Sequence, residues 1–261
     1  MTVGPRWYLP VLLFGLLAGG LAFASSRWIG WSGWAPATCL PDHCFCEAVG
    51  RGAVVQPANA WSSLAFALAG LAMAHGRTRP GRFSGTYRRL FGYALVTVAL
   101  GSYFYHASLT FAGQLCDMSG MYLLITFALV YGMARRGWIG SGVAVGGYVV
   151  SNAGLLAFQT AYPELRRYMF ALLVLGLSGM ELRHREGAGS TDTKWLWRGI
   201  AAMGAAFLIW VLDITKLVCS PSSWLQGHAL WHVLGAVSGW CLFRYYASEA
   251  GCLNARFSSQ P

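Results

Sequence analysis

Five polar side chains stand out in this sequence because their types and spacing suit metal-dependent hydrolysis. Ser102 and His106 are four residues apart, Asp117 follows eleven residues after His106, and His228 and His232 are again four apart. Residues four apart share one face of a helix. Three imidazoles and a water complete a tetrahedral zinc site with an open catalytic position, and such a site lowers the pKa of its water to about 7. The sequence therefore predicts that the three histidines bind zinc.

The other two residues could supply the remaining parts of a hydrolytic reaction. Asp117 could take a proton from the water and later deliver it to the leaving group. Ser102 could position the water or donate to the developing oxyanion. Taken alone, Asp117 could be a helix N-cap, Ser102 a helix-packing residue and each histidine an interhelical hydrogen-bonding group. Their joint occurrence favours a metal-dependent hydrolase.

The composition indicates which elements must position these residues. Of 261 residues, 56% are hydrophobic and only 11% are charged, with a mean hydropathy of +0.48. Soluble domains carry about 25% charged residues, which excludes a disordered chain, a coiled coil and most water-soluble enzymes. Several uncharged stretches reach the length of about 20 residues that a membrane helix needs. We therefore expect an all-α, polytopic integral membrane protein.

The uncharged stretches divide the chain into an N-terminal segment and a seven-helix transmembrane bundle. The N-terminal stretch covers 8–24, and the seven helices are expected at 60–74, 88–106, 115–133, 138–158, 166–182, 195–213 and 226–244. The predicted regions are an N-terminal hydrophobic helix or signal peptide (1–26), an outer Cys-containing segment (27–59), the seven-helix domain (60–246) and a cytoplasmic tail (247–261).

Positive charge predicts the orientation of these helices. All but five of the 19 Lys and Arg residues fall on one side of the map; the exceptions are Arg27, Arg51, Arg166, Arg167 and Lys216. Cytoplasmic loops are rich in Lys and Arg, so the C-terminus is expected in the cytoplasm, in a plasma or inner membrane if the source is bacterial. The net charge of +10 is then a topology signal and not an indication of nucleic acid binding. On this map all five polar residues lie at outward helix ends, at similar depth.

The N-terminal stretch and the cysteines leave alternatives open. Ala22-Phe23-Ala24 resembles a signal-peptide cleavage site, whereas twenty uncharged residues can also remain as an anchoring helix, which we slightly favour. The cysteines on the outer side are Cys39, Cys44, Cys46, Cys116 and Cys219. In an oxidising compartment one of the first three could be bridged to Cys219, although spacing does not fix the pairing. The alternative is a set of buried thiols.

Asp213 is a further candidate at the outer end of the sixth predicted helix. Its carboxylate could orient a metal ligand through a hydrogen bond. It could equally pair with Lys216 at the membrane interface.

The motifs around the five residues resemble those of the alkaline ceramidases, within the CREST superfamily of seven-helix membrane metallohydrolases. The matching elements are Gly101-Ser102-Tyr103-Phe104-Tyr105-His106, Asp117, His228-Ala229-Leu230-Trp231-His232, Trp210-x-x-Asp213 followed by Cys219, and Cys46-Glu47 followed by Asn59. The resemblance spans roughly 44–245. It implies zinc on the three histidines, Asp117 as acid and base, Ser102 assisting the water or the oxyanion, and Cys46 as the partner of Cys219.

One feature of that family is largely missing here. Animal alkaline ceramidases carry an acidic calcium-binding segment before the first helix, where this chain has Cys44-Phe45-Cys46-Glu47-Ala48-Val49 and then Gln56. Calcium dependence is therefore doubtful, although Asp42 and Glu47 could retain a weak site.

The resemblance predicts a zinc-dependent amidase that cleaves the N-acyl bond of a ceramide-like lipid to a long-chain base and a fatty acid. A membrane lipid substrate also suits a metal site within reach of the bilayer. Two alternatives come from the same superfamily: a seven-helix receptor, as in the adiponectin and progestin receptor branch, and an ester-cleaving lipid-remodelling hydrolase, as in the GPI-anchor branch.

Overall fold

The chain folds into a bundle of helices in the computed structural model, which describes residues 8–28, 30–40, 44–76, 83, 85–183 and 192–249. In these ranges every element longer than an isolated bridge is helical. The elements are α1 (Tyr8–Arg27), α2 (Pro57–Ser62), α3 (Leu64–His75), α4 (Thr86–Ser108), α5 (Phe111–Arg135), α6 (Ser141–Ala161), the 3-10 turn η1 (Pro163–Leu165), α7 (Arg166–Arg183), α8 (Thr193–Ile214) and α9 (Gly227–Ala247). The all-helical prediction is confirmed.

The first predicted helix of the bundle, 60–74, is instead two helices. Ser63 separates α2 from α3, and its hydroxyl donates to the carbonyl of Ala60 at 2.7 Å and to that of Ala99 at 3.2 Å. A serine that bonds to the backbone competes with the helical ladder, and hydropathy carries no signal of this. The other predicted helices agree with α4–α9 to within a few residues.

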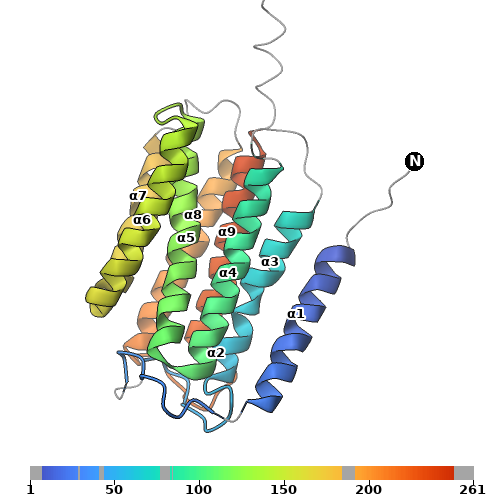
Figure 1. The fold of residues 1–261 in the computed structure, drawn as a ribbon, viewed down its shortest axis with the longest axis vertical. Coiled ribbons are helices and arrows are strands. Elements are labelled where there is room, and N and C mark those ends of the chain that lie inside the picture. The colour runs from blue at the N-terminus through green and yellow to red at the C-terminus, as the bar shows by residue number, and fades with distance from the viewer. Residues whose placement is uncertain are drawn as a thin grey trace, which may run out of the picture.

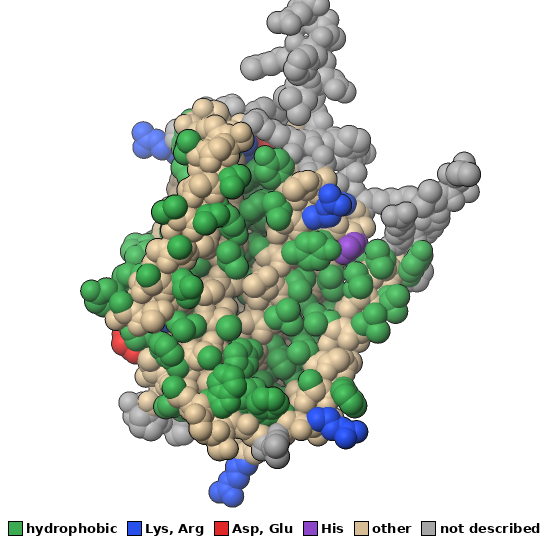
Figure 2. Space-filling model, in the orientation of Figure 1, with side chains coloured by type: hydrophobic (Ala, Val, Ile, Leu, Met, Phe, Trp, Pro, Cys, Tyr) green, Lys and Arg blue, Asp and Glu red, His purple; other side chains and the backbone are tan. Residues whose placement is uncertain are grey.

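Four helices are long and apolar enough to cross a membrane: α1, α5, α6 and α8. Of the other helices, α3 has only 12 residues, and α4 and α9 carry Ser102, His106, His228 and His232 of the candidate site. Figure 2 shows apolar side chains spread over the middle of one face of the bundle, with Lys and Arg near its two ends. This distribution is typical of a membrane protein. The count of seven spans stays a prediction.

The helices run side by side, with α4 between α3 and α5, and with α9 packed on α8 (Figure 1). Close approach of α4 to its neighbours depends on glycine. A Cβ at Gly92 would lie 2.5 Å from the carbonyl oxygen of Gly70, and one at Gly101 would lie 2.5 Å from that of Cys116. The second contact brings α4 against α5 beside Ser102 and Asp117. Small residues allow such approach between membrane helices, where packing drives association.

Two disulfides fasten the outer segment over the end of the bundle. Cys46 is joined to Cys219 in the connection between α8 and α9, which is the pairing implied by the resemblance, and Cys39 is joined to Cys44. The interpretation of these four cysteines as buried thiols is therefore wrong. Spacing gave no signal for the Cys39–Cys44 bridge in particular. Cys116 remains a free thiol.

Candidate metal and catalytic site

Three histidines from two helices meet at one end of the bundle. His106 lies in the last turn of α4, which ends where Leu109 adopts a left-handed conformation (φ 46°), and His228 and His232 lie in the first turns of α9. All three imidazoles are buried, and one nitrogen from each lies within 4.8 Å of the others. The Nε2 atoms of His106 and His228 are 3.1 Å apart. A group of this kind can hold a metal ion.

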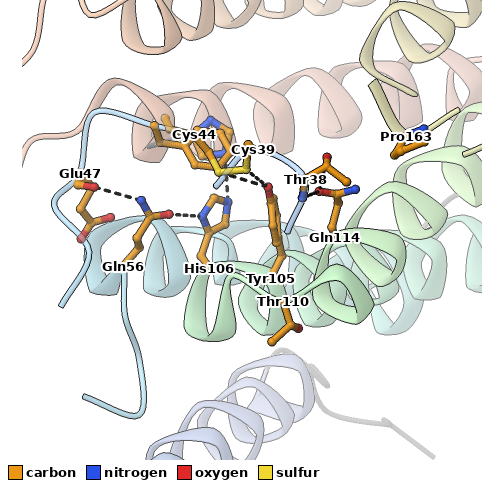
Figure 3. The surroundings of a disulfide bond; sticks show 12 residues. Thr38, Cys39, Cys44, Glu47, Gln56, Tyr105, His106, Thr110, Gln114 and Pro163 are labelled. Carbon is orange, nitrogen blue, oxygen red and sulfur yellow. Dashed lines mark hydrogen bonds between the residues drawn. A yellow bond between two sulfur atoms is a disulfide. The ribbon is translucent and has the colours of Figure 1, made fainter. Parts of the chain in front are cut away.

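The hydrogen-bond partner of His106 determines which ring nitrogen faces the centre. Gln56 Nε2 donates to the carbonyl of Glu47 at 3.0 Å, so its Oε1 faces His106 Nδ1, also at 3.0 Å (Figure 3). An amide oxygen only accepts, so His106 Nδ1 must carry the proton. Its Nε2 then presents a lone pair to the other two histidines, as a metal ligand requires.

His232 is oriented in the same way by a serine. The Ser62 hydroxyl donates to the carbonyl of Asn59 at 2.9 Å and lies 2.9 Å from His232 Nδ1. Because its proton is already engaged, the hydroxyl accepts from Nδ1, which leaves the His232 Nε2 lone pair free. His228 has no comparable partner, and its buried Nδ1 makes no hydrogen bond within the described part of the chain. Two of the three rings are thus held with a lone pair toward the centre.

Ser102 and Asp117 lie beside the histidines. Ser102 Oγ is 3.1 Å from His232 Nε2, and the serine also interacts with the Asp117 carboxylate. The close contact at Gly101 brings α4 against α5 where Ser102 and Asp117 lie. The structure therefore brings together all five residues that the sequence singled out.

The N-cap interpretation of Asp117 is wrong. The third helix of the bundle, predicted to begin at residue 115, begins at Phe111. Its N-cap is Thr110, whose side chain accepts from the amide of Gly113 at 3.1 Å. The short outer connection is consequently tighter than predicted, and Asp117 lies in the second turn with its carboxylate available to the site.

A long cavity leads from the histidines into the bundle between α5, α7, α8 and α9. Ser102, Asp117, His228 and His232 line one end, and Glu181 lines the other. On α7 the lining extends from Arg166 to Glu181, which at 1.5 Å per residue is about 22 Å. The walls between the ends are mainly apolar; they include Met121, Phe170, Val174, Leu177, Met203 and Phe207. Such a cavity suits a hydrocarbon chain.

Comparison with known proteins identifies the family. The family model described as Ceramidase matches residues 42–258, which include the five site residues and the lining of the cavity. The chain belongs to the ceramidase family. No curated protein matches it. The family hydrolyses the amide bond of ceramide, so the predictions of family and enzyme class are confirmed, and the match favours an amidase over the receptor and esterase alternatives.

In this member of the ceramidase family, Asp213 binds the backbone amide of His228. Its buried carboxylate accepts from the amide of His228 and from that of Cys46, each at 3.1 Å. The alternative pairing with Lys216 is wrong, because Lys216 Nζ donates instead to the carbonyl of Phe45 at 2.7 Å. Asp213 thus fixes the start of α9 and with it the position of His228.

Glu47, one of the two residues that could retain a weak calcium site, is engaged in hydrogen bonds with the backbone. Both oxygens of Glu47 accept from backbone amides at the start of α2, from Ala58 at 2.7 Å and from Asn59 at 2.8 Å. Burial raises the pKa of the Glu47 carboxyl, and these two hydrogen bonds limit the rise. Asp42 lies outside the described residues. Glu47 is therefore engaged in holding α2, the helix that carries Ser62.

Sequence reasoning missed three residues of the site. Gln56 was noted only as the replacement of an expected acid, Ser62 was not considered, and Arg167 was counted only as an outer cation. Gln56 and Ser62 reach histidines 50 and 170 residues away. No local periodicity carries that information. For Arg167 a signal existed: it is one of only five cations assigned to the outer side.

Proposed function

We propose that the chain is a membrane-embedded, zinc-dependent enzyme that hydrolyses the N-acyl bond of ceramide-like lipids to a long-chain base and a fatty acid. The observation that carries the proposal is the arrangement of His106, His228 and His232, with Ser102 and Asp117 beside them at the end of an apolar cavity. The family supplies the amide bond of ceramide as the point of cleavage.

The three histidines suit zinc as donors. Hydrogen bonds from Nδ1 of His106 and His232 leave their Nε2 lone pairs directed inward, and the burial of all three rings favours the neutral form that ligates. The orphaned Nδ1 of His228 leaves its ring free to adopt either tautomer. Zinc held by these three histidines would supply a Lewis acid for the carbonyl and lower the pKa of water.

Asp117 and Ser102 carry the proton and charge movements. The Asp117 carboxylate accepts a proton from the water that attacks the amide carbonyl carbon, and then donates it to the nitrogen of the departing amine as the C–N bond breaks. The Ser102 hydroxyl donates to the carbonyl oxygen as negative charge develops on it. The products are a carboxylic acid and an amine, which balance the atoms of the amide and one water.

The bilayer supplies the substrate in this proposal. The cavity walls accept a lipid chain, and the polar site lies near the helix ends that the distribution of Lys and Arg assigns to the outer side. The same distribution leaves the C-terminus in the cytoplasm.

The test measures zinc content and N-acyl lipid hydrolysis on the same detergent-purified samples of the parent, His228→Ala and Asp117→Asn. We expect about one zinc per parent chain, loss of zinc in His228→Ala, and retained zinc with lost turnover in Asp117→Asn. A chain-matched ester in the same assay distinguishes amidase from esterase. A zinc-free, inactive parent that still binds the lipid would overturn the enzyme proposal in favour of a receptor.

A further inference from the structure

Two adjacent arginines at the start of α7 line the cavity at its histidine end, and they differ in how they are held. Arg166 is buried, and it donates to Thr38 Oγ1 at 3.2 Å and to the carbonyl of Pro163. It therefore ties the outer segment to η1. Arg167 forms no ion pair with the described residues, and its Nη2 is buried without a hydrogen-bond partner there. The guanidinium of Arg167 is therefore available to bind a further group.

Aromatic rings fix where the Arg167 guanidinium lies. Its Cζ is 5.7 Å from the ring centroid of Phe45 and 5.6 Å from that of Trp210. Phe45 in turn lies against His228, with ring centroids 4.0 Å apart. Contacts with ring faces hold a guanidinium in place without using its N–H groups. The donor edge of Arg167 is thus preorganised one aromatic ring away from the histidines.

The charges at this end of the cavity do not balance. The charged side chains that line it are two cations, Arg166 and Arg167, and one anion, Asp117. Outside the lining, Glu164 acts on Arg166, which leaves Arg167 with Asp117 as the nearest opposite charge, and a divalent metal ion on the histidines would add positive charge. Arg167 is close enough to Asp117 and His228 for their charges to interact. An unpaired charge in a cavity of low polarity is costly. A ceramide with an uncharged head group would leave that cost in place.

Resting on the proposed function, we propose that Arg167 binds an anionic head group, so that the favoured substrates are N-acyl lipids whose polar end carries a phosphate or a carboxylate. The deeper walls of the cavity are apolar and take the chains, which leaves the polar end of the lipid at the level of Arg167. A guanidinium edge matches the two oxygens of either anion.

The test uses binding to zinc-free, full-length protein in detergent, so that no hydrolysis intervenes. The probes are two N-acyl lipids with identical chains, one with a hydroxyl head and one with a phosphate monoester head. We expect the parent to bind the phosphate lipid at least about tenfold more tightly, as a charge-assisted hydrogen bond allows. Arg167→Gln should abolish this preference and Arg167→Lys should keep part of it. Arg27→Gln, which removes an outer arginine that also lies over a ring, should keep it in full.

Two results would overturn the inference: a parent without the preference, or a preference that survives Arg167→Gln in folded protein. A third result would also overturn it: Arg167→Gln weakens the binding of a free fatty acid relative to the matched alcohol and leaves the binding of the two N-acyl lipids unchanged. Arg167 would then bind the fatty acid product. Turnover by zinc-loaded parent separates the two proposals. No hydrolysis of either lipid, with the binding preference intact, contradicts the enzyme and leaves the head-group site standing.

Discussion

The two ends of the cavity, which we call outer (the histidine end) and inner (the Glu181 end) after the predicted orientation, bury ionisable groups in opposite ways. At the inner end, Glu181 is fully buried and its carboxylate meets both Arg135 and Arg136, with the hydroxyls of Tyr245 and Tyr246 each at 3.2 Å. Arg135 also pairs with Glu249 at 2.7 Å, so that two guanidiniums face two carboxylates. At the outer end, Arg167 has no such partner among the described residues.

The difference separates a structural use of buried charge from a functional one. The inner cluster joins the C-terminal ends of α5, α7 and α9 and is balanced by its own members. Among the described residues, the outer end carries histidine lone pairs, a His228 Nδ1 without a hydrogen bond and an Arg167 without an ion pair, which are the groups that our proposals assign to a metal and a lipid head group. Substitutions at the inner end should therefore change stability, and those at the outer end should change binding or turnover.

The largest effect is expected from Glu181→Ala. Removing one partner of a buried ion pair leaves an uncompensated charge and costs about 3–5 kcal/mol, so the free energy of unfolding in detergent should fall by that order. Zinc content per folded molecule should not change, because the histidines lie at the far end of the cavity. Glu249→Gln is the matched control, and it should cost less because Glu249 forms an ion pair with Arg135, whereas Glu181 meets both Arg135 and Arg136. Loss of zinc in folded Glu181→Ala would contradict the division between the two ends.

The histidine end of the cavity could be predicted from the sequence, whereas the Glu181 end could not. Helix lengths, their order and the common depth of the five site residues followed from uncharged stretches and from the positions of Lys and Arg, which report the bilayer. The cluster around Glu181 was not predicted, since Arg135 and Glu181 belong to different helices and do not differ in sequence from ordinary helix-end charges. The Ser63 break and the Thr110 cap depend on single side-chain hydrogen bonds, which hydropathy does not record.

Ser102→Ala should lower turnover without loss of metal. Removing one donor to a developing oxyanion lowers kcat by about a hundredfold to a thousandfold. Thr97→Ala, on the same helix, is the matched control because its exposed hydroxyl donates to the carbonyl of Tyr93 at 3.0 Å, away from the histidines. Measuring kcat and zinc content for both variants checks this. Equal losses in the two would indicate that Ser102 acts through the packing of α4.

Gln56→Leu should weaken zinc binding by about 10–100-fold. The substitution removes the acceptor that orients His106, and partners of this kind typically contribute that much to metal affinity. Gln56→Glu keeps an acceptor oxygen and should lose less. Competition with a zinc chelator measures the affinity of each variant. Equal weakening by Leu and Glu would mean that Gln56 matters through its amide donation to Glu47 and not through His106.

The smallest effects concern Glu47 and calcium, and they test whether the outer end needs a second metal. Both Glu47 oxygens already accept backbone amides, whereas calcium requires six to eight oxygen ligands. Adding calcium or a calcium-selective chelator should therefore change neither Tm nor turnover, while Glu47→Gln should lower the free energy of unfolding by about 1 kcal/mol through the weakened start of α2. If chelation lowers Tm in the parent but not in Glu47→Gln, the carboxylate is a calcium ligand. In that case the hydrogen bonds to Ala58 and Asn59 would describe only the calcium-free form, and calcium would act on His232 through α2 and Ser62.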